Sequence, residues 1–164
     1  MKQMDETGLK LCKAQAELFA ASVSLAGCSS AVFLRRFMNS NVAKRMDDGS
    51  FLFESDTKES IAAEIEEEFG KTDYGKVKYG ENELYWMGYL YRYWCYTYEK
   101  TSRQVYRIIK PGELRELFFP YHSLDTGAAI ERILEAKNIR QDDMTARGVE
   151  ILRRITCRAR NNPA

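Results

Sequence analysis

The sequence predicts an all-α fold: a single-domain multi-helix bundle around one aromatic-rich central helix, with a basic helix appended at the carboxyl end. Two observations favour this class. Apolar residues recur at helical spacing through most of the chain. Ten glycines and three prolines are few for an all-β protein, in which turns are frequent. With 164 residues, 45% of them hydrophobic, the chain is long enough to bury a core of its own.

The central helix is predicted over Glu81–Lys100, a segment that holds both tryptophans and six of the ten tyrosines. At about 100° per residue, it has one narrow polar stripe, and nearly all of the remaining circumference is aromatic or aliphatic. The stripe consists of Glu81, Gly88, Arg92 and Glu99. A helix that is apolar almost all round is buried on most sides. Because buried hydroxyl and indole N–H groups need partners, we expect a core that contains polar groups, or a partner interface.

Two helices and a short continuation are expected in the first fifty residues. The first helix covers about residues 7–26 and ends at Gly27. Its apolar residues are Leu9, Leu11, Ala14, Leu18, Ala21, Val23 and Leu25. A serine at position 29 or 30 caps the second helix, and Ser40 or Asn41 caps the continuation, which ends at residue 49. The inward residues of the second helix are Val32, Phe33, Leu34 and Phe37.

Residues 50–55 are short and aromatic, and we expect either an isolated extended segment or a loop that places its phenylalanines in the core. Asp56, followed three residues later by Glu59, is similar to a capping box and predicts a helix that runs to residue 70. The apolar residues of this helix recur at every fourth position: Ile61, Ile65 and Phe69. Residues 71–80 are expected to be a loop with tight turns at two glycines.

After the central helix, a pair of short helices is predicted over 102–110 and 111–119. Thr101 or Ser102 caps the first, and Pro111 begins the second at a favourable first-turn position. The pair has the outline of a helix-turn-helix over residues 102–119. A further helix is expected over 126–138. Its inward residues are Ala129, Ile130, Ile133 and Leu134.

The last predicted helix runs from Asp142 to about Arg160 and is basic and amphipathic. Its narrow apolar stripe consists of Met144, Gly148, Ile151, Ile155 and Ala159. We expect the helical domain to cover residues 1–138, and this helix with a frayed tail to cover residues 139–164.

Acidic and basic residues are separated along the chain, although the net charge is only +1. Residues 47–68 carry nine acidic side chains against one lysine, and residues from 140 onward carry six arginines against three acidic side chains. Such faces can bind a partner protein, nucleic acid or a second copy of the chain, or they can simply be solvated. The candidate binding residues for a partner or nucleic acid are Glu64, Glu67, Glu68, Arg147, Arg154 and Arg158.

No catalytic, cofactor or metal signature is present in the sequence. The four cysteines form no CxxC pair and His122 is the only histidine, so we expect reduced, buried thiols and no metal site. His122 and Asp125 share a loop, but a lone loop histidine is more often structural than catalytic. Neither a secretory leader nor an apolar run of about 20 residues occurs. We therefore expect a cytoplasmic protein that is not an enzyme and does not contact a membrane.

The run from Val32 to about Lys137 resembles a group of small, antitoxin-like proteins of anaerobic gut Firmicutes, which are commonly encoded beside small toxin-like genes. The resemblance is carried by VFLRRFMNSNVAKRMD, SFLFES, AAIERILEAK and the long stretch YWMGYLYRYWCYTYEKTSRQVYRIIKPGELRELFFPYHSLD. It implies no catalytic residues, and the arginine-rich end after Asn138 lies outside it.

These observations lead to three hypotheses about function. The first is a non-catalytic interaction protein, the antitoxin of a bacterial toxin–antitoxin pair, which binds a cognate toxin directly. The alternative is a nucleic-acid-binding transcriptional regulator that uses residues 102–119 or the arginine-rich C-terminal helix. The third is an enzyme with an aromatic pocket in which tyrosines and Arg92 surround a small ligand. A homo-oligomer is compatible with each of them.

Overall fold

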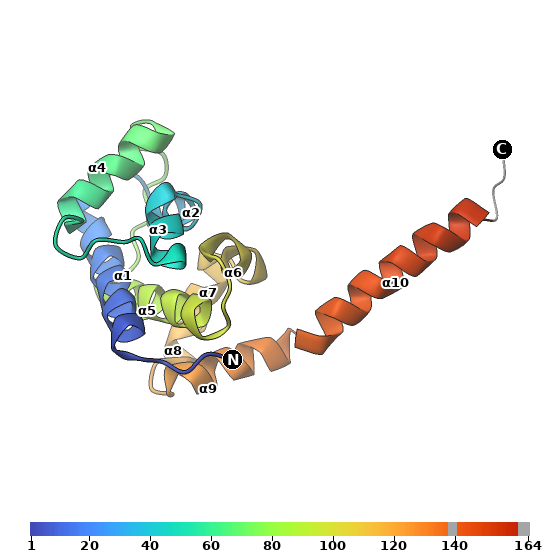
Figure 1. Ribbon diagram of the computed structural model, residues 1–164. Coiled ribbons are helices and arrows are strands. Elements are labelled where there is room, and N and C mark those ends of the chain that lie inside the picture. Colours follow the sequence, from blue (N-terminus) through green and yellow to red (C-terminus); the bar gives the residue numbers. More distant parts are fainter. Residues whose placement is uncertain (138–140, 161–164) are drawn as a thin grey trace. The chain divides into compact units, whose positions relative to one another are not determined.

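The computed structural model describes residues 1–137 and 141–160, apart from the side chains of 141–145, and within these ranges it is all-helical, as predicted. Figure 1 shows the helices in chain order. They are α1 (Glu6–Leu25), α2 (Ser30–Met38), α3 (Asn41–Asp48), α4 (Lys58–Phe69), α5 (Glu81–Thr97), α6 (Ser102–Ile108), α7 (Pro111–Glu116), α8 (Phe118–Tyr121), α9 (Thr126–Ala136) and α10 (Gln141–Arg160).

The chain forms two compact units, one of residues 1–127 and one that begins at Ala128. The first unit contains α1 to α8, and α10 belongs to the second. The boundary predicted at residues 138/139 falls at residues 138–140, which lie outside the described part of the chain.

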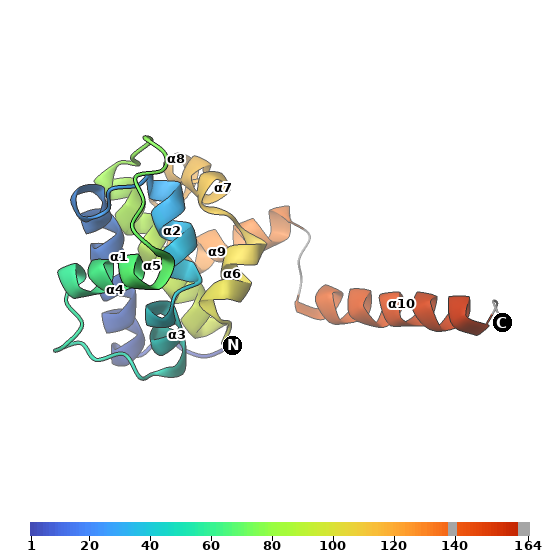
Figure 2. The ribbon, with the colours of Figure 1, turned by 90° about the horizontal axis from the view of Figure 1, so that it is seen from above.

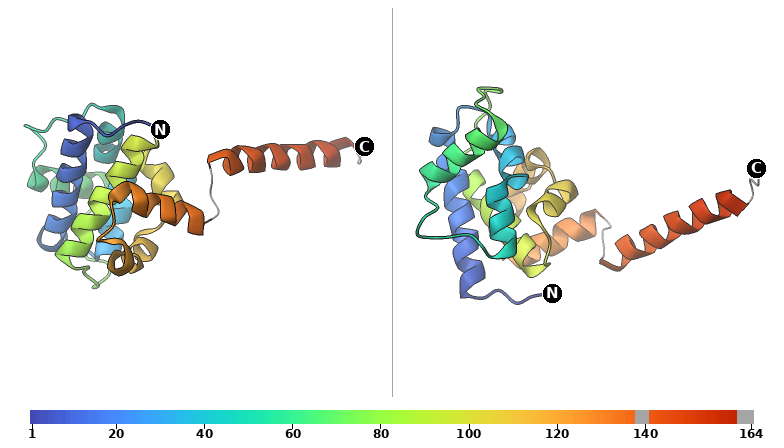
Figure 3. Two further views of the ribbon diagram at one scale, coloured as in Figure 1. Left: turned by 90° about the horizontal axis from the view of Figure 1, so that it is seen from below. Right: turned by 45° about the horizontal axis from the view of Figure 1, so that its top comes forward.

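Helix α5 is the centre of the first unit. It lies beside α1 and also contacts α6, α7 and α8, as Figure 2 shows from above. Helix α4 packs on α1, α2 and α3 (Figure 3). The predicted polar stripe of α5 does not face solvent as a whole, because Gly88 and Arg92 are buried while Glu81 and Glu99 at its ends are exposed.

Helices α1 and α5 approach each other closely at Gly88. A Cβ atom added there would lie 2.9 Å from both the Ala16 Cα and the Gln15 carbonyl oxygen. Small residues on both helices therefore allow the two backbones to meet. The buried face of α1 differs from the predicted one: Leu9 is exposed, whereas polar Gln15 is buried at the crossing.

Three of the predicted helix starts are present. Ser29, Ser40 and Thr101 cap α2, α3 and α6 with their side-chain oxygens. The capping box predicted at Asp56 was wrong, because Thr57 caps α4. The Asp56 carboxylate instead accepts hydrogen bonds from the Leu52 N–H and the Arg45 guanidinium.

Residues 50–55 form a loop and no strand, which is the second of the two predicted alternatives. Phe51 is buried as that alternative predicted, but Phe53 is exposed. The helix predicted over 111–119 is divided, because α7 ends at Glu116 and the single turn of α8 follows.

We predict that Gly88→Ala destabilises the protein, because the new methyl group forces α1 and α5 apart. Overpacking of this kind costs about 1–3 kcal/mol. Urea unfolding followed by tryptophan fluorescence measures the change, since Trp94 is fully buried. Gly112→Ala is the matched control, because the nearest atom to an added Cβ there lies 4.0 Å away. Equal stability of the two variants would contradict the prediction.

Candidate interaction surfaces

Arg92 lies in the core and is only 1% exposed. Each of its three guanidinium nitrogens donates a hydrogen bond within the chain. Nε donates to the Gln15 Oε1 (2.8 Å), and one terminal nitrogen donates to the Asp47 Oδ1 (2.6 Å). The other donates to the Ser102 Oγ (2.8 Å). A buried charge is stable only when it is paired and hydrogen-bonded in this way.

The partners of Arg92 are themselves bonded to one another. The Asp47 carboxylate accepts hydrogen bonds from the Ser102 backbone N–H (2.9 Å) and hydroxyl (2.8 Å). The Gln15 amide donates to the Gly88 carbonyl oxygen (3.1 Å). Arg92 therefore joins α1, α3, α5 and α6 as a structural residue, and its guanidinium is directed at protein groups instead of at a ligand pocket.

The acidic candidates lie on α4, which carries five glutamates and one lysine. Glu64 accepts two hydrogen bonds from the Arg45 guanidinium, at 2.7 and 2.9 Å, and these lower the pKa of its carboxyl. The Glu68 carboxylate accepts from the Asn41 backbone N–H at 3.0 Å. Glu67 is exposed. Glu64 is thus engaged inside the fold, and the accessible acidic surface is formed mainly by the other glutamates of α4.

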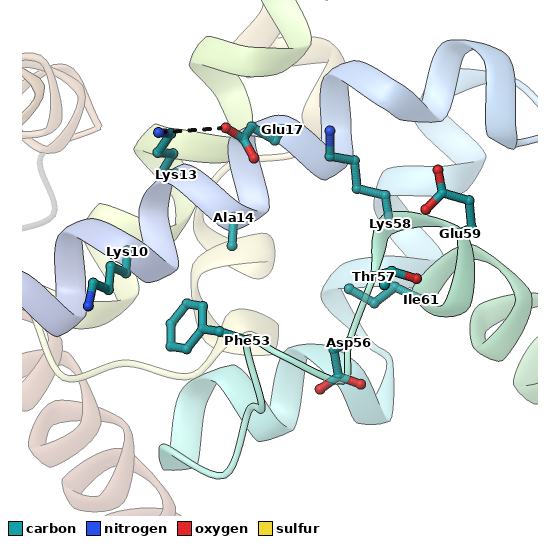
Figure 4. A pocket seen from close by; sticks show the side chains of 10 residues that line it. All are labelled: Lys10, Lys13, Ala14, Glu17, Phe53, Asp56, Thr57, Lys58, Glu59 and Ile61. Atoms are coloured by element: carbon teal, nitrogen blue, oxygen red, sulfur yellow. Dashed lines mark ion pairs between the residues drawn. The ribbon is translucent and has the colours of Figure 1, made fainter.

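A cleft of about 500 Å³ lies beside α1, the 53–57 segment and the start of α4 (Figure 4). Its lining carries Lys10, Lys13, Ala14, Glu17, Phe53, Asp56, Thr57, Lys58, Glu59 and Ile61. Three lysines and three carboxylates balance each other, so the cleft has no net preference for an anion or a cation. No group of histidine, cysteine and acidic residues that could hold a metal ion occurs among the described residues.

Helix α10 presents the basic candidates, and all of its described side chains, from Ala146 to Arg160, are exposed. At about 100° per residue, Arg147, Arg154 and Arg158 form one row along the helix. Arg153 and Arg160 form a second row. Arg154 also pairs with Glu150 at 3.1 Å, an exposed contact of small energetic value.

An apolar stripe runs between the two arginine rows of α10. Its large side chains are strongly exposed: Val149 44%, Ile151 57%, Leu152 65% and Ile155 60%. The stripe predicted from the sequence contains Ile151 and Ile155 but lacks Val149 and Leu152, whose spacing from them is also helical. The side chain of Met144, also predicted in the stripe, lies outside the described part.

Comparison of the chain with protein-family models, curated proteins and solved structures finds no match in any of the three. Within the described residues, no helix is both long and apolar enough to span a membrane.

We predict that Asp47→Ala strongly destabilises the protein, because it leaves the Arg92 charge buried without its counter-ion. Removing one partner of a buried ion pair costs about 3–5 kcal/mol. Asp48→Ala is the matched control, because this neighbouring carboxylate is exposed and its loss should cost less than about 1 kcal/mol. Chemical unfolding measures both values, and a difference below 1 kcal/mol would argue against the structural role of the ion pair.

We also predict that one thiol of four reacts rapidly in the folded protein. Cys157 is exposed, whereas Cys12, Cys28 and Cys95 are buried. Burial raises the pKa of Cys12 to about 12 and of Cys95 to about 11, so these groups stay protonated at about pH 8 and lack the reactive thiolate form. In the native protein, one thiol per chain should react rapidly with a thiol reagent, and Cys157→Ser should abolish this rapid reaction. After denaturation of the wild-type protein, all four thiols should react. Two fast equivalents in the native protein would be inconsistent with this burial.

Proposed function

We propose that the protein is a non-catalytic interaction protein of the bacterial cytoplasm, the antitoxin of a toxin–antitoxin pair, and that it neutralises its partner by direct binding. Two features support the proposal. One is the resemblance of residues 32–137 to antitoxin-like proteins encoded beside toxin genes. The other, which carries the argument, is the exposed apolar stripe of α10 between two rows of arginine.

The stripe has the character of a binding segment. Single exposed aliphatic residues are ordinary on protein surfaces, but a contiguous apolar face on one helix marks a surface that another molecule covers. An amphipathic helix typically binds by laying this face into an apolar groove of its partner. Val149, Ile151, Leu152 and Ile155 supply the apolar contact.

The charged residues of α10 indicate the chemistry of the partner. Every basic residue from 141 to 160 is arginine and none is lysine, although lysines outnumber arginines in the rest of the chain. The guanidinium group forms paired hydrogen bonds with carboxylates and phosphates and is more weakly hydrated than an ammonium group. We therefore expect the partner's groove to carry acidic groups along both edges, as in an enzyme site that α10 would occlude.

Nucleic-acid binding is the second candidate function, and the row of Arg147, Arg154 and Arg158 favours α10 as its location. Residues 102–119 fit this role less well, because α7 is only six residues long and buries Pro111 and Leu114. The apolar stripe between the arginine rows favours a protein partner over a phosphate backbone, which offers it no apolar contact.

Co-expression with the product of the adjacent gene tests the proposal. We expect the wild-type chain to relieve toxicity and to co-purify with that product. Arg147→Glu/Arg154→Glu/Arg158→Glu should abolish both effects and weaken binding at least about tenfold, since it reverses charge along the contact.

The matched control reverses the same number of exposed charges elsewhere, with Lys71→Glu/Arg107→Glu/Arg132→Glu, and should rescue normally. Rescue by both triple variants, or by neither, would contradict α10 as the binding surface. Absence of rescue and of a complex with the wild-type chain would exclude this gene product as the partner and with it the antitoxin proposal.

A further inference from the structure

The chain carries an acidic, apolar surface that is complementary to α10. We define it as the acidic segment, residues 48–59, which joins α3 to α4. Leu52 is 62% exposed and Phe53 is 45% exposed. Asp48, Glu54 and Glu59 of the same segment are exposed as well. The segment thus combines two exposed apolar side chains with exposed acidic residues, whereas α10 combines exposed aliphatic side chains with arginines.

The shape of the acidic segment is maintained by contacts that leave this surface available. Two contacts hold the Asp56 side chain in place. Its carboxylate accepts a hydrogen bond from the Leu52 N–H at 3.2 Å and forms an ion pair with Arg45 at 3.3 Å. Phe51 is buried and its ring contacts the Phe53 ring edge-to-face at 5.2 Å. Phe53 is therefore anchored while part of it borders the 500 Å³ cleft shown in Figure 4.

We propose that α10 of one chain docks on the acidic segment of a second copy. Ile151, Leu152 and Ile155 would cover Leu52 and Phe53. The arginines of α10 would pair with exposed carboxylates of the segment. Each chain carries both surfaces, so α10 of each chain can bind the acidic segment of the other. The same contact then forms twice and gives a closed, symmetric dimer. This inference stands whether or not the partner is a toxin, and a partner that binds the stripe competes with the dimer.

The charge pattern of α10 argues against direct pairing of two α10 helices. Arginines lie on both sides of the stripe, so two such helices packed through it bring like charges together along both edges. Docking of α10 on the acidic segment instead brings opposite charges together. Of the lysines at the neighbouring cleft, Lys10 and Lys13 are compensated by Glu6 at 3.2 Å and Glu17 at 4.0 Å. Lys58 is the third lysine at this cleft, and its positive charge would repel an arginine of α10.

The purified full-length chain tests the proposal in two measurements. Light scattering after size exclusion, at about 100 µM protein, gives the mass. Energy transfer between donor and acceptor dyes attached to Cys157 of different chains measures how dimer formation depends on protein concentration. Cys157 is exposed, lies on the side of α10 opposite the stripe, and is the accessible thiol, so the dye does not obstruct the contact.

We expect a dimer that Ile151→Asp/Ile155→Asp converts to a monomer, with a loss of affinity of at least about a hundredfold. Both residues are exposed, so the fold is retained. The charge-reversed variants Arg154→Glu/Arg158→Glu and Glu54→Arg/Glu59→Arg should each be monomeric alone and should pair when mixed. Arg107→Glu, an exposed charge on α6, should leave the dimer unchanged.

A wild-type chain that stays monomeric at this concentration would overturn the proposal, and so would a dimer that survives the aspartate substitutions. Failure of the two charge-reversed variants to pair would overturn it as well. These readouts use no toxin, so their failure is distinct from failure of the co-expression test.

Discussion

The structure depends on the buried ion pair between Arg92 and Asp47. Taking a guanidinium group out of water costs several kcal/mol, and the cost is offset only when counter-ion and hydrogen-bond acceptors are all in place. Here the acceptors come from three other helices: Gln15 on α1, Asp47 on α3 and Ser102 at the start of α6. Four helices must therefore be assembled before Arg92 is satisfied. This requirement favours one arrangement of the bundle over others of similar apolar content.

The same constraint explains why the aromatic helix is a core element. Gly88 and Arg92 lie one turn apart on α5, and both face partners that α1 supplies. The Tyr91 hydroxyl donates to the Ile109 carbonyl at 2.8 Å, and burial raises the pKa of Tyr91 well above its ordinary value. In the described part of the chain, only the Trp94 indole nitrogen is a buried side-chain polar atom without a partner. Of the tyrosines of residues 81–100, Tyr91 is thus part of the core, whereas the others are half-buried or, in the case of Tyr85, exposed.

The charged surfaces are the basis of the proposed binding function. The internal pairs with Arg45 remove Asp56 and Glu64 from the accessible acidic charge, and Arg92 removes Asp47. What remains is an acidic segment with Leu52 and Phe53 exposed, and a helix with the opposite charge and an exposed aliphatic stripe. We therefore propose that the protein works by binding and that the opposite charges of the two surfaces allow a second copy to cover α10.

The sequence alone determined the helices, most of their caps and the central helix, predicted over residues 81–100 and observed over Glu81–Thr97, because helical periodicity and capping chemistry are local. It also located the arginine row of α10. It could not determine which carboxylates form ion pairs inside the fold. Arg45 pairs with Glu64, and Arg92 with Asp47, only after segments distant in the sequence are brought together. For the same reason Asp56 was misassigned as a cap and Leu9 as an inward residue. Only tertiary packing decided that Arg92, in the middle of the polar stripe of α5, is buried, because a charge is buried only where other helices supply its partners.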